Sequence, residues 1–168
     1  MSNYLDTRDL YKRQCELQEA LDTLETELQD AQDELEEMQG TLEDAESEKE
    51  YSTGEEREEL DTQIGEAQEA VDAAKQTLST WQEEYQEELI ELDDLETDVG
   101  REWMHGETLI PEDEFTAYAQ NLAEETGALP ADAGWPIAGN IDWDQAADEL
   151  KQDYTTVTYQ GTDYLFRS

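Results

Sequence analysis

The stretch from Leu17 to Ala45 reads LQEALDTLETELQDAQDELEEMQGTLEDA, and it decides the fold of the first half of the chain. Its apolar seam repeats at alternating steps of four and three residues, which is an unbroken heptad pattern. Glu, Asp, Gln and Thr fill most other positions, and Gly40 is the only strongly helix-weakening residue. The stretch therefore predicts one long helix whose narrow apolar stripe needs a partner. The seam consists of Leu17, Leu21, Leu24, Leu28, Ala31, Leu35, Met38, Leu42 and Ala45.

The partner of this stripe lies just downstream in the same chain. The segment 50–54, EYSTG, has the composition of a turn, and a second heptad seam follows it. If the chain folds back there, the position numbers of facing residues have a nearly constant sum, as for Leu28 with Leu78 and Leu24 with Trp81. An antiparallel hairpin requires that constancy, so two helices over about 7–49 and 55–99 are predicted. The second seam consists of Leu60, Ile64, Ala67, Val71, Ala74, Leu78, Trp81 and Tyr85.

Polar residues near the open end of this hairpin are expected to fix how its helices pair. Gln14 would face Leu92 and interrupt the seam, which is a common way to set the register of a coiled coil. The only basic cluster lies beside it, and we expect it to neutralise carboxylates of the opposite helix. The cluster consists of Arg8, Lys12 and Arg13, and the expected carboxylates are those of Asp93, Asp94 and Glu96.

The fold class predicted for the whole chain is mainly α, with an acidic antiparallel coiled-coil hairpin over residues 1–99 and a small α+β domain over 100–168. Gly100 ends the helical pattern, and residues 103–110 are expected to form a loop or a short strand. Pro111 suits the first position of a helix that Gly127 ends. The aromatic residues expected in the core of this domain are Trp103, Phe115, Trp135, Trp143 and Phe166.

The C-terminal third carries two further local signals. Asp142 is expected to cap a short helix that runs to about Gln152. Two segments rich in β-branched and aromatic residues follow, at 154–159 and 162–166, with Gln160-Gly161 between them. This arrangement predicts a β-hairpin.

The composition restricts the classes of partner. The formal net charge is −39, from 48 acidic and 9 basic residues. Nucleic acid and anionic membranes would be repelled, so we expect neither as a direct partner and expect a basic protein instead. Cys15 is the only cysteine, and no apolar run approaches a leader or a membrane span. We therefore expect a protein of the host-cell cytoplasm.

Residues that could support catalysis or hold a cofactor do not form a known pattern. His105 has no Cys or second His with which to share a metal. Asp142 and Asp144 begin like a calcium loop, but the third ligand and the glycine do not follow. Glycine-rich phosphate loops and nucleophile elbows are also missing from the sequence. We expect no enzymatic activity, no catalytic residue, no cofactor and no metal.

The charge has a geometric meaning on the predicted hairpin. Between Gln14 and Asp98 there are 32 acidic residues against Lys49, Arg57 and Lys75, a net charge of −29. The helices would be about 60 Å long, and the pair would be about 20 Å wide. Along its length the pair would carry roughly one net charge per 2 Å, whereas duplex DNA carries one phosphate charge per about 1.7 Å of its axis. The residues that flank the seam are also expected to face mostly acidic residues, at a cost in stability. Residues 99–168 have about half this charge density, so a salt-adapted composition does not explain the excess on the hairpin.

The C-terminal region resembles a known family. Residues 141–167, IDWDQAADELKQDYTTVTYQGTDYLFR, put an Ile-Asp-Trp helix start before an Asp-Tyr hairpin that ends in an aromatic residue. Together with GETLIP at 106–111 and the pattern Phe115-x-x-Tyr118-Ala, this resembles the tail of antirestriction proteins of the ArdA type and related phage or plasmid proteins. The resemblance implies a mobile-element protein that blocks a host defence enzyme by imitating DNA. The long hairpin departs from ArdA, which is elongated but is not a coiled coil.

Charge and resemblance lead to one expected function and one alternative. We expect a DNA mimic whose acidic hairpin occupies the DNA groove of a restriction enzyme or other defence nuclease. The C-terminal domain would orient the hairpin or mediate homodimerisation. The alternative is a structural coiled-coil adaptor from a salt-adapted organism or its virus. The residues expected to form the partner-binding surface are Glu34, Glu37, Asp44, Glu83, Glu84, Glu87 and Glu91.

Overall fold

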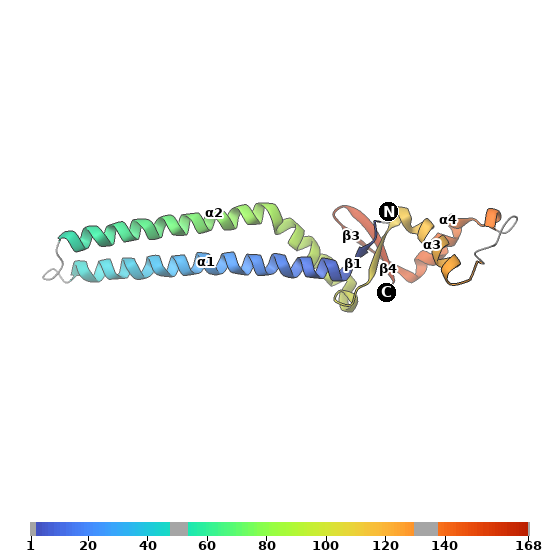
Figure 1. Cartoon of the computed structure of the whole chain (residues 1–168), viewed down its shortest axis with the longest axis horizontal. Helices are drawn as coiled ribbons and strands as arrows, with labels where there is room; N and C mark the ends of the chain where they lie inside the picture. The colour runs from blue at the N-terminus through green and yellow to red at the C-terminus, as the bar shows by residue number, and fades with distance from the viewer. Residues whose placement is uncertain (1–2, 48–53, 130–137, 168) are drawn as a thin grey trace. The chain divides into compact units, whose positions relative to one another are not determined.

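The computed structural model describes residues 3–47, 54–129 and 138–167, which form four helices and four strands with short 3-10 turns between them (Figure 1). The strands are β1 (Leu5–Asp6), β2 (Thr108–Pro111), β3 (Tyr154–Tyr159) and β4 (Thr162–Arg167). The helices are α1 (Thr7–Ser47), α2 (Gly54–Val99), α3 (Phe115–Glu125) and α4 (Trp143–Leu150). The 3-10 turns are Gly100–Glu102, Glu112–Glu114, Ala138–Asn140 and Lys151–Asp153.

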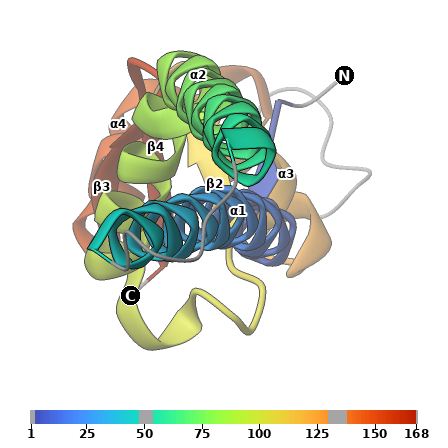
Figure 2. The same ribbon diagram turned by 90° about the vertical axis from the view of Figure 1, so that its left-hand side faces the viewer.

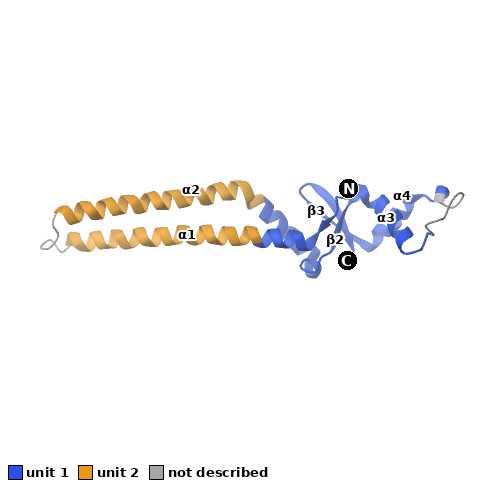
Figure 3. Cartoon of the chain, in the orientation of Figure 1, with its two compact units in different colours: residues 1–15, 88–168 blue, residues 16–87 orange. Residues whose placement is uncertain are grey.

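The chain packs as two compact units (Figure 3). We call residues 16–87 the hairpin unit, and residues 1–15 with 88–168 the sheet unit. These limits differ from the division at residue 99 that the sequence suggested, because the first turns of α1 and the last turns of α2 pack with the sheet unit. Each unit is therefore described by itself.

The hairpin unit is the antiparallel helix pair that the heptad pattern predicted. Residues 16–47 of α1 lie beside residues 54–87 of α2 in two views at right angles (Figure 1 and Figure 2). Every seam position in this unit is buried or half-buried, with Val71 only 2 % exposed, and the outer helix positions are exposed. The predicted fold class, with a long helix pair and a small β-containing unit, is confirmed. Most of the predicted turn at 50–54 falls outside the described residues, and α2 begins at Gly54.

Local signals at the helix ends behave as expected. The Asp6 carboxylate accepts a hydrogen bond from the Arg8 backbone N–H at 2.9 Å, so it caps the start of α1. Gly100, with a φ of +68°, follows the last residue of α2 in the left-handed conformation that ends many helices. The Asp142 carboxylate accepts from the Gln145 backbone N–H at 3.1 Å and caps α4, as predicted.

The sheet is larger than the predicted hairpin. β3 and β4 pair around Gln160 and Gly161, whose φ values of 49° and 73° make the two-residue turn that the sequence indicated. β2 joins the other edge of β4, and β1 joins β2, which gives an antiparallel sheet of order β1-β2-β4-β3. β1 was not predicted, because a two-residue strand has no measurable periodicity.

The prediction for Pro111 was wrong. Pro111 ends β2 with an extended backbone, at φ −55° and ψ 137°, and a 3-10 turn separates it from α3. The fixed φ of proline suits an extended residue as well as the first residue of a helix, so the sequence alone did not decide between them. Gly127, in the left-handed conformation, follows the end of α3 as predicted.

The core of the sheet unit contains three of the five predicted aromatic residues. Trp103, Phe115 and Phe166 are almost fully buried, and Trp143 is half-buried. Trp135 lies outside the described residues. Phe115 forms a cluster with Ile110, Ala119, Ala147 and Leu165, which joins α3 and α4 to the sheet.

Candidate functional site

The hairpin unit carries a large uncompensated charge. Its described residues, 16–47 and 54–87, include 24 acidic residues against Arg57 and Lys75, a net charge of −22. The 32 residues of α1 in this unit rise about 48 Å, at about 1.5 Å per residue. The net charge is therefore about one per 2 Å along the pair, which is close to the value expected from the sequence.

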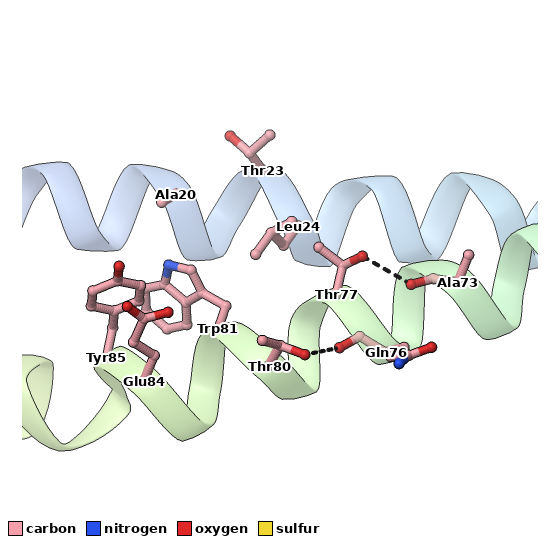
Figure 4. Close-up of a pocket in the computed structure, with 10 residues that line it drawn as sticks. All are labelled: Ala20, Thr23, Leu24, Ala73, Gln76, Thr77, Thr80, Trp81, Glu84 and Tyr85. Carbon is pink, nitrogen blue, oxygen red and sulfur yellow. Dashed lines mark hydrogen bonds between the residues drawn. The ribbon is translucent and has the colours of Figure 1, made fainter.

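One side of the helix pair is defined by a groove between α1 and α2. Ala20 and Thr23 of α1 line this groove together with Thr77, Thr80 and Glu84 of α2 (Figure 4). Since residues three and four apart share a helix face, other residues can be assigned to the same side by their spacing. We call it the groove side.

A row of carboxylates continues along α1 on the groove side. Its members follow Ala20 and Thr23 at heptad spacing, and all of them are exposed. We call them the acidic row, which consists of Glu27, Asp30, Glu34, Glu37 and Asp44.

The structure places the seven predicted surface residues in three groups. Five share the groove side, and these are Glu34, Glu37 and Asp44 on α1 with Glu84 and Glu87 on α2. Glu83 is also exposed, and it lies seven residues after Gln76, which lines the groove, so it is placed at the edge of the groove side.

Glu91 was expected to be an exposed member of this surface, and that expectation was wrong. It belongs to the sheet unit and is half-buried. Burial raises the pKa of the Tyr159 hydroxyl, and the Glu88 and Glu91 carboxylates raise it further.

The expectation that acidic residues face one another beside the seam was also wrong. The groove contains both Leu24 and Trp81, and this register puts Glu27 beside Thr77, Glu34 beside Ala70 and Gln32 beside Lys75. The carboxylates thus point outward, where cross-seam repulsion is small, and Glu46 forms an ion pair with Arg57 at 3.0 Å.

Glutamine side chains support these acidic helices without neutralising them. The amides of Gln18 and Gln29 donate to Asp22 and Asp33 one turn later, each at 2.7 Å. Gln68 donates to Asp72 in the same way at 3.2 Å. Such pairs stabilise a helix by about 0.2–0.5 kcal/mol each and leave the negative charge in place.

The remaining repulsion runs along each helix, and salt should screen it. We expect the melting temperature of the hairpin unit to rise between about 10 mM and about 150 mM NaCl, because the Debye length falls from roughly 30 Å to 8 Å. Circular dichroism at 222 nm measures this. A variant with the acidic row changed to Gln and Asn should respond less to salt. A wild-type melting curve that is insensitive to salt would contradict the expectation.

Gln14 forms the main polar contact of the sheet unit. It is only 7 % exposed, and its Nε2 donates to Asp93 Oδ1 and to Glu96 Oε2, both at 2.7 Å. Its Oε1 accepts from the Trp103 indole Nε1–H at 2.8 Å. Because the carboxylates can only accept, these three partners fix the orientation of the amide. Gln14 is the predicted polar interruption of the seam, but its hydrogen-bond partners were not predicted.

The predicted partners of the basic cluster were wrong for two of its members. Arg8 forms an ion pair with Asp6. Arg13 forms a bidentate ion pair with Glu88, in which Nε donates to Oε1 at 2.8 Å and Nη2 donates to Oε2 at 3.0 Å. The amide of Gln14 occupies Asp93 and Glu96 instead.

The Arg13–Glu88 pair should make stability depend on pH. The Arg13 guanidinium holds the pKa of the Glu88 carboxyl below its ordinary value of 4.5. A lowered carboxyl pKa stabilises the fold above the ordinary value, and this stabilisation is lost as the pH falls through the folded value. We expect Glu88→Gln to lower the free energy of unfolding at pH 7 by at most about 1 kcal/mol, because Arg13 is 41 % exposed.

Urea unfolding at two pH values tests the Glu88→Gln prediction. The difference from the wild type should be present at pH 7 and should shrink at about pH 3. An equal difference at both pH values would show that the lost contact is not ionic.

Within residues 3–47, 54–129 and 138–167, no group of three or more His, Cys, Asp or Glu side chains is arranged to hold a metal ion. None of the helices in the same ranges is long and apolar enough to cross a membrane. His105 is exposed, and Asp142 serves as a helix cap. The feature that most distinguishes the surface of the hairpin unit is therefore its negative charge and the position of the acidic row on the groove side.

A comparison of the chain with protein-family models, curated proteins and solved structures finds no match. The resemblance of the C-terminal region to ArdA-type proteins stays a prediction.

Proposed function

We propose that this protein is a non-enzymatic inhibitor that imitates DNA. Its hairpin unit would occupy the DNA-binding groove of a basic protein, such as a restriction enzyme or another defence nuclease. The observation that carries the proposal is the outward-facing net charge of −22 on the described residues of the hairpin unit, at a density close to that of a duplex.

The geometry of the acidic row supports the proposal. Its first four carboxylates are three or four residues apart, which corresponds to rises of about 4.5–6 Å along α1. Both helices are held by the seam, so the charges sit on a pre-formed scaffold as phosphates do on a duplex. Hydrogen bonds from glutamine hold several other carboxylates in place without cancelling them.

The sheet unit has a supporting role in the proposal. The resemblance of residues 106–167 to ArdA-type tails favours a defence enzyme as the target. The sheet unit would orient the hairpin on that enzyme or pair two copies of the chain.

A nuclease-protection assay tests this function. A panel of restriction and other defence nucleases would cleave labelled DNA with and without the protein, at several salt concentrations. We expect protection that competes with DNA and weakens steeply as salt rises, because ion release drives binding between highly charged surfaces. If no DNA-binding protein is inhibited or retained at moderate salt, the proposal fails.

One observation favours a coiled-coil adaptor as a second candidate. Residues 70–82 of α2 contain one carboxylate, Asp72, and one cation, Lys75, so this stretch is far less acidic than α1 opposite it. An adaptor would use this weakly charged stretch to bind a protein, and added DNA would not compete with that binding. Competition with DNA therefore separates the two functions.

A further inference from the structure

The groove between α1 and α2 has a volume of about 790 Å³ and lies entirely within the hairpin unit (Figure 4). This is within the usual range of ligand pockets, about 300–1,000 Å³. The groove is lined by Ala20, Thr23, Leu24, Ala73, Gln76, Thr77, Thr80, Trp81, Glu84 and Tyr85.

The groove exists because two large aromatic rings of α2 lie beside a small side chain of α1. Trp81 and Tyr85 occupy two successive seam positions of α2, where leucine is the usual residue. Their ring centroids are 5.7 Å apart with the planes tilted by 46°, and both residues are half-buried. Ala20, on the opposite helix, is too short to fill the space beside the rings (Figure 4). Part of the Trp81 surface is therefore left open to a partner.

The charge around the groove selects the kind of partner. Glu84 lines the groove, and Glu27 of the acidic row follows Thr23 by one turn on the same side. Arg57 and Lys75, the cations among the described residues of this unit, do not line it. An anion, or the equally acidic surface of a second copy, would be repelled, so the matching occupant is a cation.

We propose that the groove receives an arginine side chain on a basic segment of the partner protein. The guanidinium would stack on Trp81 and donate hydrogen bonds to the Glu84 carboxylate. Arginine fits better than lysine, because its planar group both stacks on aromatic rings and pairs with a carboxylate through two hydrogen bonds. This inference rests on the proposed function, since it names the contact that a basic partner makes on the acidic surface.

Two synthetic peptides of equal length and charge test the inference, one with three arginines and one with three lysines, separated by glycine and serine. The full chain would be titrated with each peptide at moderate salt, and affinity would be measured by fluorescence anisotropy. We expect the arginine peptide to bind about fivefold more tightly. It should also shift the indole N–H signal of Trp81 in the NMR spectrum of the ¹⁵N-labelled protein.

A double variant isolates the groove from the acidic surface. Trp81→Leu with Tyr85→Leu keeps the net charge and supplies ordinary seam residues, so the helix pair should remain folded, as circular dichroism can verify. It should lose the preference for arginine and keep the affinity for the lysine peptide. The matched control, Trp81→Phe with Tyr85→Phe, keeps aromatic rings and should keep the preference.

The outcomes separate this inference from the proposed function. If the wild type binds both peptides equally, or the double leucine variant keeps the preference, the arginine site is wrong. Salt-dependent binding of both peptides would still support the acidic surface. If neither peptide binds and no nuclease is inhibited, the proposed function fails and the inference fails with it.

Discussion

Neutralising the acidic row is expected to abolish inhibition of the target while the hairpin remains folded. The variant changes Glu to Gln and Asp to Asn at Glu27, Asp30, Glu34, Glu37 and Asp44. Each exposed pair contributes roughly 0–1 kcal/mol, so the five together should lower the affinity by about a hundredfold or more. A single change outside the groove, such as Glu37→Gln, should be nearly silent for the same reason. The measurement is the concentration of protein that gives half-maximal protection of DNA.

A second variant with the same change in charge serves as the matched control. It neutralises five acidic residues of α1 that do not lie on the groove side, namely Asp22, Glu25, Glu36, Glu43 and Glu46. If the groove side is the binding surface, this control should lose far less affinity than the acidic-row variant. Equal losses would show a general attraction with no preferred side. No loss in either variant would contradict the proposed mimicry.

Replacing Gln14 by glutamate is expected to cause the largest loss of stability. The change removes two hydrogen bonds to carboxylates and places a third carboxylate beside Asp93 and Glu96. Hydrogen bonds to charged groups contribute about 1.5–3 kcal/mol each, so the free energy of unfolding should fall by about 3 kcal/mol or more at pH 7. Urea unfolding measures this. The loss should shrink as the pH is lowered, because a protonated carboxyl donates a hydrogen bond again.

Gln14→Leu is the control for this experiment. It removes the amide without adding charge and leaves the indole N–H of Trp103, which is 1 % exposed, without its acceptor. A buried donor without a partner costs about 1–3 kcal/mol at any pH, so part of the loss in this variant should remain when the pH is lowered. If Gln14→Glu is as stable as the wild type at pH 7, the hydrogen bonds of Gln14 with Asp93, Glu96 and Trp103 do not stabilise the sheet unit.

The candidate surface was predictable in kind but not in detail. Its charge follows from composition, and Glu34, Glu37 and Asp44 share a side because residues three and seven apart do so on any helix. The register predicted from the two seams already pairs Leu24 with Trp81 and places Glu27 opposite Thr77. The expectation of facing acids was therefore wrong on the sequence itself. The groove depended on which small residues lie opposite Trp81 and Tyr85. The small Ala20 beside the seam was the one sequence signal that pointed to it.

The sequence by itself determined the helix pair, the cap at Asp142 and the turn at Gln160-Gly161. These features arise from heptad periodicity or from the preferences of single residues, and both can be read locally. Only the tertiary structure decided that Leu5 pairs with Leu109 and that Trp103 donates to Gln14. These contacts join residues about a hundred positions apart and carry no repeating pattern. They depend on how the buried surfaces of distant elements fit together, which no local segment encodes.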